Sequence, residues 1–180
     1  MPPASTELRV DGWLLRPPDA ETEAGAALAL LHDPDVAQWN PAPLVVDLAS
    51  AAEWCRRGAD WSSGSHATFS ILDAATGAFV GNVSIHNIDV EQGTADVGYR
   101  IAAGYRNRGA ASAGVRAATA FALDDLGLFR VQLLHAVPNV ASCRVAEKAG
   151  FTLEGTMRLG GAYGDQRHDE HLHARLRGDD

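Results

Sequence analysis

The sequence predicts an α/β (α+β) fold in which one mixed, mostly antiparallel sheet of about seven strands carries helices on both faces. Two observations lead to this prediction. Apolar-rich runs over 66–72, 78–88 and 95–102 are joined by short polar turns, which is typical of an antiparallel meander. The last of these runs enters a helix through a glycine turn, and another apolar run follows over 130–137. Such a strand–helix–strand crossover places its two strands parallel to each other.

Composition limits the classes of protein that the chain could belong to. The whole chain, 1–180, has the length of a single domain with room for a core. A net charge of -8 argues against general nucleic-acid binding, and two cysteines, Cys55 and Cys143, make no disulfide framework. Residues 1–6 lack the features of a secretory signal, and the longest apolar run, over 26–31, is too short to span a bilayer. We therefore expect a cytoplasmic protein without a nucleic-acid or membrane partner.

Helix caps and prolines divide the first half of the chain. Asp19 follows two prolines and precedes Glu21 and Glu23, which the helix dipole favours in a first turn. Prolines within 33–46 exclude one continuous helix, so this segment is predicted as a loop. In order, the predicted elements are a strand over 7–16, a helix from Asp19 to about His32, and a second helix from an Asp47 or Ser50 cap through Trp61.

The second half of the chain is divided by glycines. Gly150 ends a short helix that Asn139 caps, and the segment 160–165 is predicted as the loop between two closing strands. In order, the predicted elements after the meander are a helix over 110–126, a strand over 130–137, a helix over 139–149, and strands over 151–159 and 166–176.

The glycine turn over 105–111 is the most informative segment. A helix that starts at a glycine turn directs unpaired backbone N–H groups, and the positive end of its dipole, at the content of the turn. The stretch 97–123 has four arginines and no acidic residue, although the chain is acidic overall. These features favour a bound phosphate, and the alternative is a surface loop followed by a core helix. The spacing of Gly104 and Gly109 does not fit a dinucleotide fingerprint, and Lys148, the only lysine, is too distant for a nucleoside triphosphatase loop.

Two motifs in this region resemble those of the GNAT superfamily of acyl-coenzyme A N-acyltransferases. Arg106, Gly109 and Ala111 match the R-x-x-G-x-A pyrophosphate loop. The segment Asn139–Phe151 resembles the N-x-x-S-x-R-V-x-E-K-x-G-F segment of the branch with the Rim-type ribosomal-protein N-acetyltransferases. The resemblance implies acyl transfer, usually of acetyl, from the thioester of coenzyme A to a primary amine. It also implies a central strand that splays from its parallel neighbour to admit the pantetheine arm.

The same resemblance implies where acetyl-coenzyme A would bind. Backbone groups of the central strand would hold the pantetheine arm, with Gly98 as a bulge or close approach, and the glycine turn would hold the pyrophosphate. The implied coenzyme-binding residues are Tyr99, Arg100, Ile101, Arg106, Asn107, Arg108, Gly109, Ala110, Ala111 and Asn139.

Proton transfer requires an acid and a base. The tyrosine that many GNAT enzymes use as the acid is replaced by Ala146, so Ser142, which the Rim-like branch places near the sulfur, is the predicted acid. Its alternative role is to satisfy backbone N–H groups at the helix start. Asp96 is the predicted base, directly or through water, and its alternative is a solvated strand-edge carboxylate. Cys143 is expected to be a small buried residue rather than a nucleophile. Three neighbours could substitute as the base: His86, Asp89 and Glu91.

The remaining histidines are assigned no chemistry. His135 lies in the buried return strand and is predicted to be a core histidine. Strand alternation puts His171 and His173 on one face and His168 on the other, and no cysteine is expected to accompany them, so no metal is expected.

The acceptor is predicted with alternatives. The resemblance makes the helical hairpin with its proline loop one wall of the acceptor groove, with Trp39 and Tyr163 as candidate substrate contacts. A protein N-terminal α-amine is the predicted acceptor, as in the Rim-type branch, and a small amine such as a polyamine, amino acid or antibiotic is the alternative. A noncatalytic acyl-coenzyme A sensor is the alternative from another class, and the assembly is a monomer or homodimer.

Overall fold

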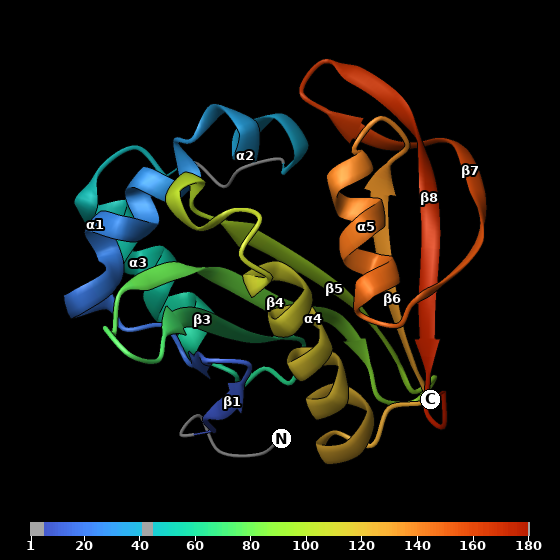
Figure 1. The fold of residues 1–180 in the computed structure, drawn as a ribbon, viewed down its shortest axis with the longest axis horizontal. Helices are drawn as coiled ribbons and strands as arrows, with labels where there is room; N and C mark the ends of the chain where they lie inside the picture. Colours follow the sequence, from blue (N-terminus) through green and yellow to red (C-terminus); the bar gives the residue numbers. More distant parts are fainter. Residues whose placement is uncertain (1–5, 41–44, 180) are drawn as a thin grey trace.

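The computed structural model describes residues 6–40 and 45–179, and it contains one eight-stranded sheet. The strands follow the order β1-β2-β3-β4-β5-β6-β8-β7, and every neighbouring pair is antiparallel except β5 and β6 (Figure 1). The mixed, mostly antiparallel sheet with one central parallel pair is therefore confirmed. The strands are β1 (Leu8–Val10), β2 (Trp13–Arg16), β3 (Ala67–Asp73), β4 (Phe79–Asp89), β5 (Thr94–Ile101), β6 (Arg130–Ala136), β7 (Thr152–Tyr163) and β8 (Gln166–Leu176).

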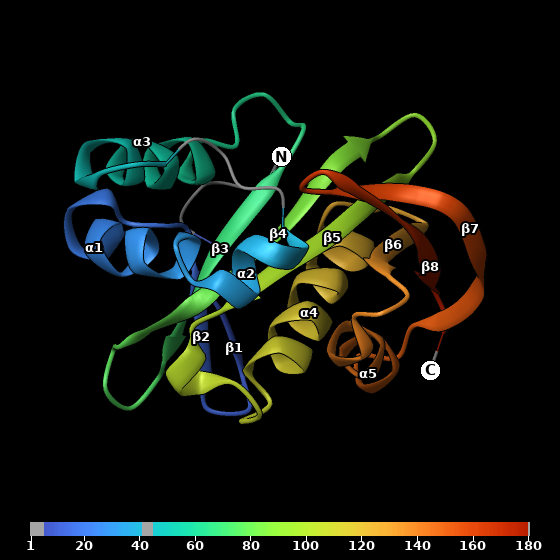
Figure 2. The same ribbon diagram turned by 90° about the horizontal axis from the view of Figure 1, so that it is seen from above.

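Helices cover both faces of this sheet, as the sequence predicted. Figure 2 shows α1 and α3 on one face and α4 and α5 on the other, while α2 lies over the end of the sheet near β4 and β5. No helix among residues 6–40 and 45–179 is long and apolar enough to cross a membrane. The α-helices are α1 (Ala20–Leu31), α2 (Pro34–Trp39), α3 (Leu48–Ala59), α4 (Ala110–Ala120) and α5 (Val140–Lys148).

The predicted single strand over 7–16 is wrong, because the chain reverses in its middle. Asp11 and Gly12 have φ angles of 48° and 83° and form the turn of a hairpin between β1 and β2. An Asp-Gly pair favours this kind of two-residue hairpin turn, because both residues tolerate the left-handed conformation. The eighth strand of the sheet comes from this reversal.

The segment 33–46 holds a short helix where a loop was predicted. Asp33 caps α2 through its side chain, which accepts hydrogen bonds from the N–H groups of Asp35 and Val36. Pro34 occupies the first turn, where its missing N–H costs nothing. Residues 41–44, which include Pro41 and Pro43, lie outside the described residues. The other predicted caps are confirmed: Asp19 caps α1, and Asp47 caps α3 with Ser50 completing a capping box.

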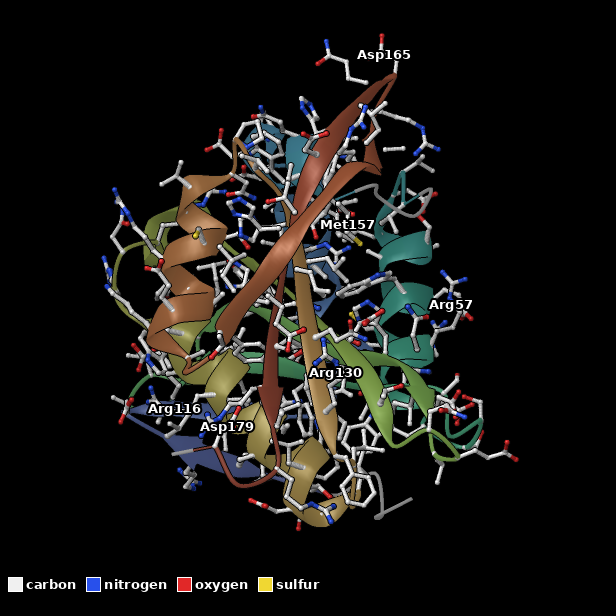
Figure 3. The ribbon with its side chains drawn as sticks, turned by 90° about the vertical axis from the view of Figure 1, so that its right-hand side faces the viewer. Arg57, Arg116, Arg130, Met157, Asp165 and Asp179 are labelled. Atoms are coloured by element: carbon white, nitrogen blue, oxygen red, sulfur yellow. The ribbon has the colours of Figure 1, made fainter. Side chains whose placement is uncertain are left out.

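Two details of the second half differ from prediction. Strand β7 extends to Tyr163, so most of the predicted loop over 160–165 is strand, with irregular pairing between Met157 and Gly161. The β7–β8 hairpin therefore reaches far beyond the sheet, with Asp165 at its tip and Met157 lower on β7 (Figure 3). Gly98 marks no bulge, because it pairs in register with Ser84.

The hydrophobic core lies between the sheet and α4. Its centre is an aromatic cluster in which Phe69 packs edge-on against Trp61 and Phe121, with ring centroids 5.0 and 5.3 Å apart. Phe121 begins a wide π-helical turn, Phe121–Asp125, which prolongs α4 to nearly the predicted end. This packing fixes α4 against β4 and β5, and so fixes the glycine turn that precedes α4.

Candidate active site

The parallel pair β5 and β6 separates after a short contact. Pairing is limited to Thr94–Asp96 of β5 with Arg130–Gln132 of β6, and both strands continue beyond it. Ala102 N–H donates to the Val80 carbonyl, so alternation turns the main-chain groups of Val97, Tyr99 and Ile101 away from β4 and toward the gap. The predicted splay is therefore present, and main-chain groups of β5 face it, of which the Ile101 carbonyl accepts a hydrogen bond from Arg106 Nε at 3.3 Å.

A cavity of about 670 Å³ occupies this gap. Its lining comes from β5, β6, the glycine turn, one side of α5, α2 and the end of β7. Nearly all the predicted site residues therefore line one space. Those lining it are Tyr99, Arg100, Ile101, Arg106, Asn107, Gly109, Ala110, Ala111, Asn139, Ser142, Trp39 and Tyr163.

The glycine turn presents a row of main-chain donors. Within the described chain, the N–H groups from Asn107 to Ser112 have no protein acceptor. Asn107 and Gly109 have φ angles of 61° and 85°, left-handed conformations that let successive N–H groups converge. A Cβ atom on Gly109 would meet nothing within 4 Å, so the space above the turn is open. This arrangement suits a pyrophosphate.

Arginine side chains contribute less to this turn than the sequence suggested. The guanidinium of Arg106 forms ion pairs with Asp33 at 2.7 Å and Asp35 at 2.5 Å, which ties the turn to α2. The hydrogen bond to Arg106 lowers the pKa of Asp33 from its ordinary value. Arg108 does not line the cavity and lies over the Tyr105 ring, 5.4 Å from its centroid. Main-chain groups are therefore the chief donors of the turn.

A pair of hydroxyl groups lies at the start of α5. Asn139 caps this helix by accepting a hydrogen bond from the Ser142 N–H at 3.2 Å. The Tyr99 hydroxyl donates to Ser142 Oγ at 3.1 Å, across the gap between β5 and α5. Burial raises the pKa of Tyr99 to about 12, so this phenol keeps its proton at neutral pH. Sequence reasoning assigned Tyr99 a main-chain role and missed its hydroxyl.

The opposite face of the sheet bears different groups. Strand register puts Asp96, Arg100 and Glu170 on the face away from Tyr99 and α5. Burial lowers the pKa of Arg100, which forms no ion pair within the described chain. The main chain of Arg100 pairs with β4, so its predicted backbone contact with the pantetheine arm is not favoured by the register.

Aromatic residues close the cavity on this second face. The rings of Trp39 on α2 and Tyr163 on β7 meet edge-on at 5.8 Å, and His168 packs against both. The Tyr163 hydroxyl donates to Glu170 at 2.5 Å. Burial and the neighbouring Glu170 carboxylate raise the pKa of Tyr163. Glu170 is not itself in the lining but bonds Tyr163, which is, and no local motif indicated this carboxylate.

The predicted bases lie elsewhere. Asp96 does not line the cavity, and its carboxylate accepts a hydrogen bond from Asn87 at 2.8 Å. The substitutes His86, Asp89 and Glu91 also lie outside the lining. Asp96 lies where β5 and β6 still pair, before the strands separate. It could therefore accept a proton from the amine only through a chain of water molecules.

Cys143 of α5 and three histidines of β6 and β8 lie close together between the helix and the sheet. Cys143 is partly buried, not fully buried as predicted. Burial and the nearby Glu147 carboxylate raise the pKa of its thiol, which disfavours a nucleophilic thiolate, and Cys143 does not line the cavity. His171 and His173 share a face, as alternation predicted, but Cys143 does accompany them in space, as does His135. The argument that no cysteine is near was therefore wrong.

Splayed parallel strands beside a cradle of free N–H groups define a class of protein that binds an acyl-coenzyme A between two strands. Comparisons with known proteins agree. Residues 13–152 match the acetyltransferase (GNAT) domain family, so the chain belongs to the GNAT acetyltransferase family.

Relatives within this family bear related names. "Putative ribosomal N-acetyltransferase YdaF" of Bacillus subtilis is 36% identical over 93 residues, which is 52% of this chain and 51% of that protein. The matched part of the chain thus spans about half the length of YdaF. An N-acetyltransferase called p20, uncharacterized, from Bacillus licheniformis is 26% identical over 127 residues, which is 70% of this chain and 71% of that protein.

Solved structures share the fold. RimL, a ribosomal L7/L12 alpha-N-protein acetyltransferase in complex with coenzyme A, superposes with a TM-score of 0.82 at 22% identity, covering 99% of this chain and 98% of that one. Ribosomal-protein-S5-alanine acetyltransferase of Vibrio fischeri gives a TM-score of 0.83 at 16% identity, covering 97% and 98%. At these identities the likeness shows the fold alone.

Proposed function

We propose that this protein transfers the acetyl group of acetyl-coenzyme A to a primary amine, and that this amine is the α-amine at the N-terminus of a protein. One observation carries the proposal: a single cavity crosses the sheet at the splay. On one face it reaches the unpaired N–H groups of the glycine turn, and on the other it reaches Trp39 and Tyr163. The Tyr99–Ser142 hydroxyl pair lies along the same cavity.

This arrangement suits direct transfer. The glycine turn would hold the pyrophosphate, and the outward main-chain groups of β5 would hold the pantetheine arm and polarise the thioester carbonyl. The amine would enter from the side of Trp39 and attack the carbonyl carbon, so that the C–N bond forms and the C–S bond breaks. Ser142 accepts a hydrogen bond from Tyr99, which leaves its own proton free for the departing thiolate. Tyr99 would then return a proton to Ser142 and regain its own from solvent water, while the proton of the amine leaves through the base.

Glu170 is the better-placed proton acceptor for the amine. Neither Glu170 nor Asp96 lines the cavity, but Glu170 bonds the cavity residue Tyr163, whereas Asp96 bonds Asn87, which lies outside the lining. A carboxylate at this wall could take the proton directly or through one water molecule. Asp96 stays as the alternative base, acting through water.

The proposed acceptor is chosen because both candidate bases are carboxylates. A peptide α-amine has a pKa near 8, so roughly a tenth to a third of it is neutral near pH 7.5, against about one in a thousand for lysine. A carboxylate base suits the first group better than the second. The names of YdaF, RimL and the Vibrio fischeri protein support the same class of acceptor.

A panel of amines tests the proposal. We would measure kcat/KM by release of the coenzyme A thiol for three acceptors: a short peptide with a free N-terminus, the same peptide blocked at its N-terminus but carrying lysine, and a polyamine. The free N-terminus should give the highest value. Preference for the blocked peptide or the polyamine would overturn the acceptor assignment. Tight binding of acetyl-coenzyme A without turnover of any amine would favour a sensor.

A further inference from the structure

Four side chains between α5 and the strands β6 and β8 bring nitrogen and sulfur atoms close together. They are His135 of β6, Cys143 of α5, and His171 and His173 of β8. Their ligand atoms all lie within 4.8 Å of one another. Within residues 6–40 and 45–179, no other group of three or more histidine, cysteine or acidic residues converges in this way. The cluster joins two neighbouring strands to the helix that packs on them (Figure 1).

Two distances within the cluster are close to those of a four-coordinate ion. In a tetrahedron with ordinary zinc–ligand bonds, two nitrogens are about 3.3 Å apart, and a nitrogen and a sulfur about 3.6 Å. The Nε2 atoms of His135 and His173 are 3.2 Å apart, and Cys143 Sγ is 3.9 Å from His173 Nε2. Each of these two edges is within a few tenths of an ångström of the tetrahedral value.

The protonation of the histidines also fits. His135 Nδ1 lies 2.8 Å from the carbonyl of Ala136, which can only accept, so Nδ1 holds the proton and Nε2 is a free lone pair. This carbonyl contact orients the ring as an outer partner of a metal ligand would. The side chains of His135 and His173 are buried, with 3% and 1% of their surface exposed. The Nδ1 atoms of His171 and His173 are buried without a hydrogen-bond partner.

Without an ion, the contacts within the cluster are few. His135 and His173 are buried and share one hydrogen bond between their Nε2 atoms, whereas Cys143 and His171 are partly buried. The Cys143 thiol also lies 3.8 Å from the Glu147 carboxylate, a weak contact. A cation would use all four groups at once, with Cys143 binding as a thiolate and releasing its proton to solvent.

We propose that His135, Cys143, His171 and His173 bind a single divalent transition-metal ion, with Zn²⁺ as the best match. Three imidazoles and one thiolate are the ligands that zinc prefers, and the set comes from three elements of the fold. Four protein ligands leave no open position for substrate, so the ion has a structural role. It cross-links α5 to β6 and β8 next to Ser142, which adjoins Cys143 in the chain.

The test is zinc binding by the full chain, purified without a histidine tag. The protein is stripped with a chelator, titrated calorimetrically with Zn²⁺, and assayed for metal content after dialysis. We expect one equivalent of zinc and a higher melting temperature that the chelator reverses. Cys143→Ser and His135→Gln should each lower the affinity by more than the roughly 10- to 100-fold that loss of an outer-shell partner costs. His66→Gln, a histidine outside the cluster, is the matched control and should bind as the wild type does.

Cobalt gives an independent readout. Co²⁺ in the stripped protein should give the intense visible bands of tetrahedral coordination and a thiolate charge-transfer band that Cys143→Ser removes. The Cys143→Ser change is nearly isosteric, so it keeps the test valid if His135→Gln does not fold. Wild-type protein that retains far less than one equivalent of zinc would overturn the proposal, and so would equal affinity in Cys143→Ser and His66→Gln.

Discussion

The glycine turn before α4 allows the coenzyme site to be tested by charge alone. Gly109 has a φ angle of 85° and no neighbour near its missing Cβ, so Gly109→Asp and Gly109→Asn add side chains of the same size into open space. Both incur left-handed strain of roughly 1 kcal/mol, and asparagine and aspartate tolerate this conformation better than most residues. The two variants differ in one negative charge beside the expected pyrophosphate.

The size of that difference follows from Coulomb's law. A carboxylate about 4 Å from a phosphate charge is unfavourable by about 4 kcal/mol at an effective dielectric of 20, and by about 1 kcal/mol in bulk water. Gly109 is exposed, so solvent moves the value toward the lower limit. We therefore expect Gly109→Asp to bind acetyl-coenzyme A roughly 10- to 100-fold more weakly than Gly109→Asn.

Calorimetry with acetyl-coenzyme A measures both affinities, and circular dichroism checks that both variants fold. The gap between the two variants should narrow as salt rises from about 0.1 to 1 M, because the screening length falls from about 10 to 3 Å. Equal losses in both variants would show that bulk rather than charge matters. Unchanged affinity in both would refute the assignment of this turn to the pyrophosphate.

Three further predictions test the reaction and the fold. Ser142→Ala should lower kcat by up to about 100-fold without changing the affinity for acetyl-coenzyme A, and Tyr99→Phe should lower it less; a full-rate alanine variant would return the serine to a capping role. Glu170→Gln should lower kcat/KM more than Asp96→Asn does, and the reverse order would reinstate the aspartate. Gly81→Ala would bring a Cβ to 2.1 Å from a backbone carbonyl oxygen of β5. We therefore expect the free energy of unfolding, measured by denaturant titration, to fall by roughly 3 kcal/mol, and a fall of less than about 1 kcal/mol would contradict the tight strand contact.

The predictions that succeeded rest on local chemistry. Asp19, Asp47 and Asn139 were recognisable as caps because each side chain bonds N–H groups within three residues of itself. The crossover of β5, α4 and β6 was predictable for a different reason: the handedness and short connections of such units leave few alternatives. The hairpin at Asp11 was missed although its Asp-Gly signal was present, because the flanking strands are very short.

The parts of the site that were missed depend on contacts distant in sequence. Arg106 meets Asp35 across 71 residues, and Cys143 meets His173 across 30. Glu170 reaches the cavity through Tyr163 only because the β7–β8 hairpin extends past the sheet. No periodicity or motif predicts such contacts between distant residues, because they depend on strand register and on how α2 and α5 pack.

The ion pairs of Arg106 with Asp33 and Asp35 give the two substrates a shared support. One side chain belongs to the loop that faces the coenzyme, and its partners belong to the helix that bears Trp39 on the acceptor wall. Occupancy of one subsite should therefore change the affinity of the other, and thermodynamic reciprocity makes the effect equal in both directions. Asp35 is 75% exposed, whereas Arg106 and Asp33 are partly buried. At about 1 kcal/mol for each ion pair near the surface, this cooperativity should be up to roughly 30-fold and should weaken with salt.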